Sequence, residues 1–277
     1  MQKDYSITAA SFLLCALLFA ATSCNTAGPK RNIDTTNPEP SLKGMNVLFV
    51  YGGWEGHDPV PSRDLFVPWM RSEGARVIVS DSLGVYTNEA LMDTIDLIVQ
   101  IWTMGEISSE QEKGLLKAIK RGVGLAGWHG GTGDSFRNNP EYQFMVGGQW
   151  VAHPGGVIDY VVNIIDPNDP VTKGIADFPM HSEQYYMHVD PNIKVLATTR
   201  FNADHADWID GNTMPVVWKK YYGKGRVFYS SLGHVIADFE VPEVLEIQKR
   251  GIRWAAGSRS HSLEELRNSK YQAISAL

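Results

Sequence analysis

Hydrophobic runs alternate with amphipathic segments in the first half of the chain. The runs are short and continuous, which is typical of strands buried on both faces, and stand at residues 45–51, 76–79, 95–101 and 123–128. Residues 61–73 and 109–121 instead place apolar side chains at helical spacing. This order of strands and helices predicts a mostly parallel sheet with helices on both faces, the doubly wound α/β class.

The second half of the domain is richer in strand patterns. Residues 157–165 and 194–199 read as strands. Residues 215–222 and 226–230 flank a Gly-Lys-Gly segment and predict a β-hairpin. A last amphipathic helix fits residues 244–256. We therefore expect a doubly wound sheet that continues into a β-rich C-terminal half.

The N-terminus has the pattern of a lipoprotein signal peptide. An apolar run from Ala9 to Ala21 follows Lys3 and is too short to span a bilayer. It ends in Ala-Thr-Ser-Cys, which resembles a bacterial lipobox with Cys24 as the lipidated residue. The alternative, a buried helix with an incidental cysteine, fits poorly with the polar, proline-containing stretch that follows. We expect export and a lipid anchor in the cell envelope. The periplasmic side is favoured over the cell surface, since residues 25–31 lack an acidic run.

These patterns divide the chain into four parts. Residues 1–24 form the signal peptide, 25–43 a polar linker, 44–257 the folded domain and 258–277 a polar tail. The linker contains three prolines and has no apolar periodicity, as expected of a tether.

Charge and cysteine content exclude two classes of function. The 277 residues carry a net charge of −6 without a strongly basic stretch, so we expect no nucleic-acid partner. The two cysteines, Cys15 and Cys24, both lie in the signal segment. The mature domain therefore has no thiol for nucleophilic catalysis or for a disulfide.

Histidines and tryptophans follow the predicted strands. His57, His129 and His234 each come directly after a strand, and in a doubly wound sheet ligands bind beyond the carboxyl ends of the strands. We expect these histidines to share one pocket, lined by the tryptophans of the same segments, which are Trp54, Trp102 and Trp128. Trp218 and Trp254 lie within periodic segments and are expected in the core.

A second set of candidate residues lies between these segments. His153 stands in a loop rich in glycine and proline, and His181, Glu183 and Tyr185 share one face if their segment is extended. Aromatic faces beside polar groups suit a sugar. The residues expected to bind substrate are Trp54, His57, Trp102, Trp128, His153, His181 and Tyr185.

The catalytic candidates are His129, His234 and Glu183. The two histidines can act as general base and acid near neutral pH, and Glu183 can orient one of them or take a proton itself. A divalent metal is the less favoured alternative, because no HExxH spacing supports it. Its ligands would be His57, His129, His181 and Glu183. Each histidine also has a plain structural interpretation, as a hydrogen-bonded residue after a strand.

Several motifs together resemble the ThuA-like family, named for trehalose utilisation and related to the class I glutamine amidotransferases. They are the first strand with Gly52-Gly53 and His57, Gly127-Trp128-His129-Gly130-Gly131, His181 with Glu183-Gln184-Tyr185-Tyr186, Pro215-Val216-Val217-Trp218, and Tyr222 to Tyr229 leading to Leu232-Gly233-His234. The resemblance implies a flavodoxin-like sheet and a role in the metabolism of disaccharides and their 3-keto forms. It does not imply amidotransferase activity, because the turn at residues 127–131 has no cysteine.

The leading hypothesis is an envelope enzyme that acts on a sugar, a 3-keto-sugar or a disaccharide, by His/Glu acid-base or metal-assisted chemistry. A non-catalytic carbohydrate-binding module and a structural envelope protein are the rivals. Closely grouped His and Glu side chains would favour chemistry, whereas dispersed histidines around an aromatic trough would favour binding. The expected partners are a small carbohydrate and, through the lipid, the membrane. The sequence leaves a homo-oligomer open.

Overall fold

The structure, a computed structural model, describes residues 41–260. The predicted signal peptide with Cys24, residues 25–40 of the linker and residues 261–277 of the tail lie outside the described residues. Within residues 41–260, no helix is long and apolar enough to cross a membrane.

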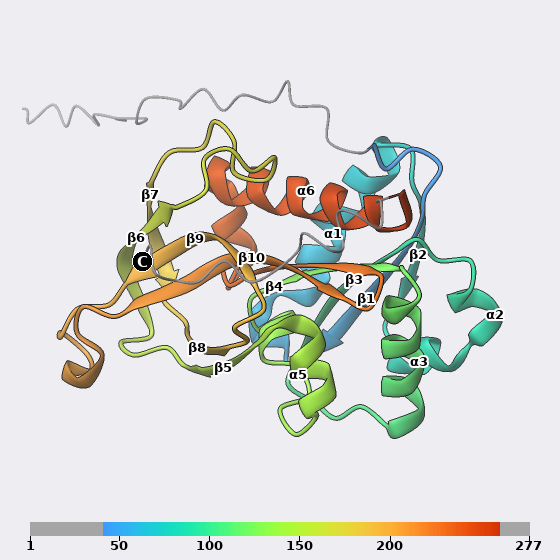
Figure 1. The fold of residues 1–277 in the computed structure, drawn as a ribbon, viewed down its shortest axis with the longest axis horizontal. Coiled ribbons are helices and arrows are strands. Elements are labelled where there is room, and N and C mark those ends of the chain that lie inside the picture. The colour runs from blue at the N-terminus through green and yellow to red at the C-terminus, as the bar shows by residue number, and fades with distance from the viewer. Residues whose placement is uncertain (1–40, 261–277) are drawn as a thin grey trace, which may run out of the picture. The chain divides into compact units, whose positions relative to one another are not determined.

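Residues 41–260 form a nine-stranded mixed sheet (Figure 1). In chain order its strands are β1 (Asn46–Gly53), β2 (Arg76–Ser80), β3 (Leu97–Thr103), β4 (Gly124–Trp128), β6 (Val157–Ile164), β7 (Phe178–Glu183), β9 (Lys194–Arg200), β10 (Thr213–Tyr222) and β11 (Gly225–Ser230). In space the order is β2-β1-β3-β4-β11-β10-β9-β6-β7. The first five strands pair in parallel and the others antiparallel. The parallel part has the strand order of a flavodoxin-like sheet, so the predicted fold class is confirmed.

Helices cover both faces of the parallel part (Figure 1). One face packs against α1 (Pro59–Ser72) and α6 (Pro242–Ala256), and the other against α3 (Ser109–Lys120) and α5 (Pro140–Val146). Alternate residues of β1 divide between the two cores: Val47 and Phe49 join one, Leu48 and Val50 the other. This division explains the continuous apolar run in the sequence, because both sides of the strand are buried.

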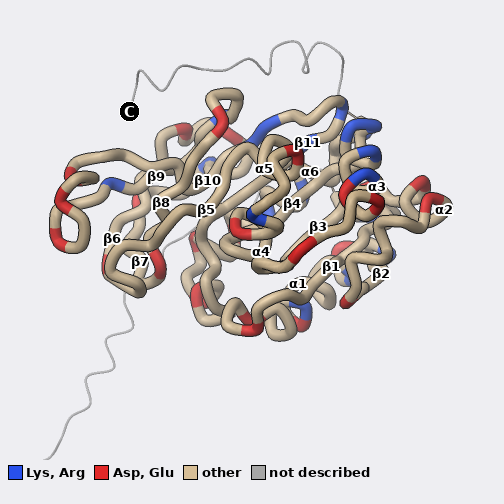
Figure 2. The backbone as a smooth tube through the Cα atoms, turned by 90° about the horizontal axis from the view of Figure 1, so that it is seen from below, with Lys and Arg blue, Asp and Glu red and all other residues tan. Residues whose placement is uncertain are grey.

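Helix α3 is the element whose start the sequence predicts best. Ser108 caps it in a capping box with Gln111, which satisfies backbone groups at the first turn. Several basic residues lie along α3, where Figure 2 marks them in blue. Lys117 pairs with Glu89 at 2.8 Å and Arg121 with Asp93 at 2.6 Å. Much of this positive charge is therefore already balanced by nearby acidic groups.

The β-rich half is confirmed and contains one feature that the sequence did not predict. Strands β10 and β11 form the predicted hairpin, and residues 178–183 are extended as β7. The missed feature is a separate two-stranded ribbon of β5 (Gly148–Ala152) and β8 (Tyr186–Val189). Both strands are short and interrupted by polar residues, so no apolar run marks them.

Candidate functional site

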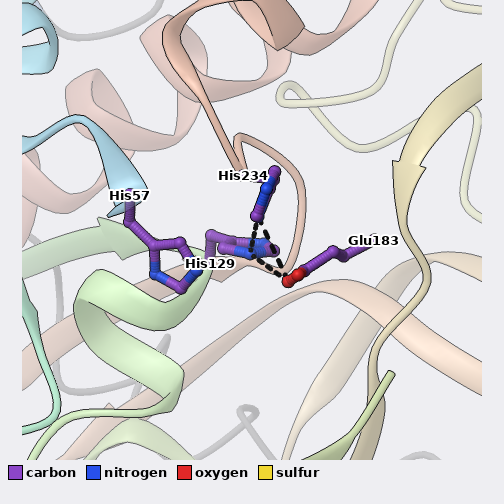
Figure 3. A group of neighbouring side chains, drawn as sticks. All are labelled: His57, His129, Glu183 and His234. Carbon is purple, nitrogen blue, oxygen red and sulfur yellow. Dashed lines mark hydrogen bonds and ion pairs between the residues drawn. The ribbon is translucent and has the colours of Figure 1, made fainter. Parts of the chain in front are cut away.

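Four side chains from four separate segments meet beyond the carboxyl ends of the parallel strands (Figure 3). His57 ends the short 3-10 helix η1 (Glu55–His57) that follows β1, and His129 directly follows β4. Glu183 is the last residue of β7, and His234 lies in the loop after β11. Each offers one potential ligand atom, and these atoms all lie within 4.8 Å of one another. We refer to these four residues as the His/Glu cluster.

The backbone at His129 is strained. Its φ of 45° and ψ of −143° lie in a region that residues with a side chain rarely adopt, at a cost of about 1–3 kcal/mol. The conformation lets the chain turn sharply from β4 into the four-residue helix α4 (Gly130–Gly133). A 2.7 Å hydrogen bond from the His129 N–H to the carbonyl of Ser230 holds the turn. Such strain at a strand-to-helix turn presents a side chain at the edge of the sheet.

The hydrogen bond made by Nδ1 of His129 fixes the tautomer of the ring. Nδ1 lies 2.8 Å from the carbonyl oxygen of Ser231, which can only accept, so Nδ1 carries the proton. The neutral ring therefore directs the lone pair of Nε2 at the Glu183 carboxylate, 3.2 Å away. Burial lowers the pKa of His129 and disfavours a second proton. The lone pair of Nε2 and the carboxylate are both hydrogen-bond acceptors, so a cation must lie between them. Because the pKa of His129 is lowered, a metal ion suits this position better than a proton.

Three of the potential ligand atoms form a nearly equilateral triangle. His129 Nε2 lies 3.2 Å from His234 Nδ1, and Glu183 Oε2 lies 3.2 Å from the first and 3.1 Å from the second. Two ligand atoms on an ion with bonds of about 2.1 Å are about 3.4 Å apart in a tetrahedral site and about 3.0 Å apart in an octahedral one. The observed spacing falls between these values. The donor set of imidazoles and one carboxylate suits a divalent transition metal.

His57 stands beside this triangle as a neutral imidazole. It is 6% exposed, and its Nδ1 lies 3.0 Å from Thr103 Oγ1. Burial, followed by the charges of His129 and His234, lowers the pKa of His57 to about 3. At neutral pH the ring is therefore unprotonated, the form that binds metals.

Glu183 stays ionised in the cluster, and buried hydrogen bonds hold it close to His234. Burial raises the pKa of Glu183, but the close imidazoles of His129 and His234 outweigh burial and lower it. The buried Asp238 accepts hydrogen bonds from the His234 backbone N–H at 2.9 Å and from Ser182 Oγ at 2.6 Å. Asp238 thus ties the loop of His234 to the residue that precedes Glu183.

Aromatic and imidazole rings surround the His/Glu cluster. Tyr185 is buried and lies over the His129 ring with centroids 4.0 Å apart. His153 places Nε2 3.7 Å from the second oxygen of Glu183, and its side chain is 37% exposed. On the other side, Trp54 is 48% exposed and meets His57 edge-on at 4.8 Å. Trp54 and His153 are thus the exposed members of this surround.

Two of the residues proposed from the sequence do not join the cluster. His181 is exposed on β7 and pairs with Asp159 at 2.7 Å, so its expected place among the ligands is wrong. Trp128 is 1% exposed and packs on Phe66 and Phe239 in the core, so the expectation that it lines the site is also wrong. Trp128 lies on β4, where alternate side chains point to opposite faces. His181 shares the face of Glu183 but lies two residues before the end of β7, where it faces Asp159 instead of the cluster.

The other tryptophans take varied positions. Trp102 is half-buried against Gly52 and Gly105. Trp218 and Trp254 are buried in the core, as expected.

Several residues at the site were not selected from the sequence. They include Thr103, Ser231 and Asp238, which orient the cluster, and Trp150 with Arg137 beside it. Thr103 had a usable signal, because it lies two residues beyond the strand predicted at residues 95–101. The remaining contacts arise only through tertiary packing.

Comparisons with known proteins identify the family of the chain and agree with its fold. The profile of the ThuA family, described as trehalose utilisation, matches residues 46–255. A ThuA-like protein from Bacteroides uniformis has a similar structure, with a TM-score of 0.65, 16% identity and coverage of 79% of this chain and 93% of that one. A ThuA-like protein from Parabacteroides merdae gives a TM-score of 0.63 at 20% identity, covering 77% and 90%. At these identities the solved structures show the fold alone. No curated protein matches the chain significantly.

Proposed function

The chain belongs to the ThuA family, and we propose that it is an envelope enzyme whose His/Glu cluster binds a divalent metal ion and acts on a sugar or 3-keto-sugar. The observation that carries this proposal is the triangle of His129, His234 and Glu183, with sides of 3.1 to 3.2 Å. The close grouping of the cluster favours chemistry over simple binding, because dispersed histidines would serve a sugar-binding surface equally well.

Each residue of the cluster has a definite part in this proposal. Glu183 supplies the negative charge, and His129 and His234 supply two nitrogen ligands. His57 is the fourth ligand in place of His181, since His181 is exposed and faces Asp159. His129 is kept in the correct tautomer by the carbonyl of Ser231, as metal-bound histidines usually are.

The chemistry follows from the charge of the site. A divalent ion bound here would polarise a sugar oxygen and lower the pKa of a bound water molecule. The protein's own groups would hold the sugar beside the ion: the exposed Trp54 ring can stack on an apolar sugar face, and His153 can hydrogen-bond a hydroxyl group. Acid-base catalysis by the histidines alone is less favoured, because the pKa values of His57 and His129 are both lowered and neither ring holds an acidic proton for donation at pH 7.

The location in the cell remains part of the proposal. The signal pattern that ends at Cys24 supports a lipid anchor. A sugar-processing enzyme in the envelope would meet its substrate after the sugar enters that compartment.

The test combines metal binding with turnover. Purified mature protein, first stripped and then loaded with Mn²⁺, Co²⁺, Ni²⁺ or Zn²⁺, is incubated with native and 3-keto disaccharides, and products are followed by mass spectrometry. We expect one metal to support conversion and Glu183→Gln to abolish it. His181→Ala is the matched control, two residues away on the same strand, and should retain activity. Sugar binding without conversion would favour the carbohydrate-binding module. The absence of both would overturn the proposal.

A further inference from the structure

A stack of side chains leads away from the cluster on the Glu183 side. His153 contacts Glu183, and the centroids of the His153 and Trp150 rings are 5.7 Å apart. The guanidinium carbon of Arg137 lies 4.7 Å from the centroid of the Trp150 ring. We name His153, Trp150 and Arg137 the outer wall. Two rings therefore separate Arg137 from Glu183, so Arg137 is placed to contact a part of the ligand beyond the group held at the cluster.

Arg137 is fixed before any ligand arrives. Its Nε and Nη2 donate hydrogen bonds to the two carboxylate oxygens of Asp134, at 2.6 and 2.8 Å. The Asp134 side chain is 4% exposed, whereas that of Arg137 is 42% exposed. One edge of the guanidinium is thus clamped, one face is covered by Trp150, and Nη1 makes no hydrogen bond within residues 41–260. A fixed donor group loses little conformational entropy when it binds a ligand.

The charge balance of this pair indicates which chemical group Arg137 takes. The buried carboxylate of Asp134 neutralises the guanidinium, so the outer edge of Arg137 offers N–H donors without a net positive charge. Such donors suit the oxygen atoms of neutral hydroxyl groups. A phosphate or a carboxylate would gain less here, because it would also meet the negative charge of Asp134.

Two polar atoms of the outer wall lack a partner in the protein. Trp150 Nε1 and His153 Nδ1 are buried and have no hydrogen-bond partner in the described part of the chain. Buried polar atoms in folded proteins usually have a partner, in the protein or in bound water or ligand. Because neither atom is accessible from the surface, a buried water molecule, rather than the ligand itself, would complete these hydrogen bonds.

We propose that Arg137 is a specificity-determining residue that hydrogen-bonds the hydroxyl groups of a second, neutral sugar unit, stacked along the outer wall. The proposal rests on the proposed function, since it requires the first unit to lie at the His/Glu cluster. Arg137 then selects ligands of at least two sugar units and disfavours ligands whose outer unit is acidic.

The test measures sugar affinity by calorimetry with metal-loaded protein. The probes are trehalose, glucose and their 3-keto forms, together with a disaccharide that ends in glucuronate. Wild-type protein should bind each disaccharide at least about tenfold more tightly than the matching monosaccharide. Arg137→Met should remove most of that difference and leave monosaccharide and metal affinity unchanged. Arg137→Lys keeps a cation beside Asp134, so it protects the fold while losing the two-pronged geometry, and it should show the same loss.

Arg253→Met is a matched control for these variants. Arg253 also pairs with a carboxylate, Glu73 at 2.9 Å, and also lies over a tryptophan ring, but it does so on α6. Its substitution should change no sugar affinity. Equal binding of mono- and disaccharides by the wild type, or an equal effect of Arg137→Lys on both, would overturn the proposal. Tighter binding of the glucuronate disaccharide would contradict the neutral second unit. If metal-loaded wild type binds no sugar at all, the proposed function itself fails.

Discussion

Gly130 offers a way to displace one ligand of the cluster without changing any ligand. A Cβ atom at this position would overlap Cε1 and Nδ1 of His57, more than about 1 Å inside van der Waals contact. The φ of Gly130 is not positive, so the backbone accepts alanine. The His57 ring must therefore retreat by about 1 Å in Gly130→Ala, while His129, Glu183 and His234 keep their places.

The size of the effect follows from the tolerance of metal bonds. Ligand distances in metal sites vary by about 0.2 Å, so a displacement of about 1 Å breaks the His57 bond. Loss of an outer-shell partner already costs 10–100-fold in metal affinity. We expect Gly130→Ala to weaken binding by about 100-fold or more, which corresponds to about 2.7 kcal/mol.

The assay is calorimetric titration of the metal-free protein with Zn²⁺ or Co²⁺. Gly84→Ala is the control, because its Cβ would meet only Ser82 Oγ at 3.2 Å in a segment outside the cluster. In a His57→Ala background, where the obstructing ring is absent, Gly130→Ala should have little further effect. Wild-type affinity in Gly130→Ala would refute the ligand role of His57. Additive losses in the double variant would refute the steric explanation.

Three further predictions concern pH, positioning and the anchor. The pKa of His57 is about 3 in the folded protein and about 6.5 in the unfolded chain. Between these two pH values, unfolding is therefore accompanied by the uptake of a proton. The metal-free protein should accordingly lose thermal stability as pH falls from about 6.5 to 3. Thermal melts with chelator present should show this loss reduced in His57→Asn, and an unchanged slope would count against it. Asp238→Asn should weaken metal binding about tenfold in the calorimetric titration and alter the visible spectrum of bound Co²⁺. The reason is that Asp238 ties the His234 loop to Ser182. An unaltered spectrum would show that Asp238 has a purely structural role. Cys24→Ala should move the protein from the membrane to the soluble fraction on cell fractionation, since acyl chains provide the anchor, and retention in the membrane fraction would contradict the lipoprotein interpretation.

Much of the fold could be predicted from local patterns. The apolar runs of β1 and β3 are continuous because those strands are buried on both faces, and α3 begins at the capping box of Ser108. The short strands β5 and β8 could not be found, because their stability depends on pairing with each other rather than on an apolar run.

The sequence by itself determined that His57, His129 and His234 meet, because parallel strands deliver their carboxyl ends to one edge of the sheet. It could not separate His181 from Glu183 as metal ligands, because the two residues share one face of an ideal strand. Tertiary structure made that choice: His181 is exposed within β7, whereas Glu183 ends the strand next to the loop of His234. Likewise only packing placed Arg137 against Trp150. Contacts between segments far apart in the chain depend on how the layers pack, and no local periodicity records them.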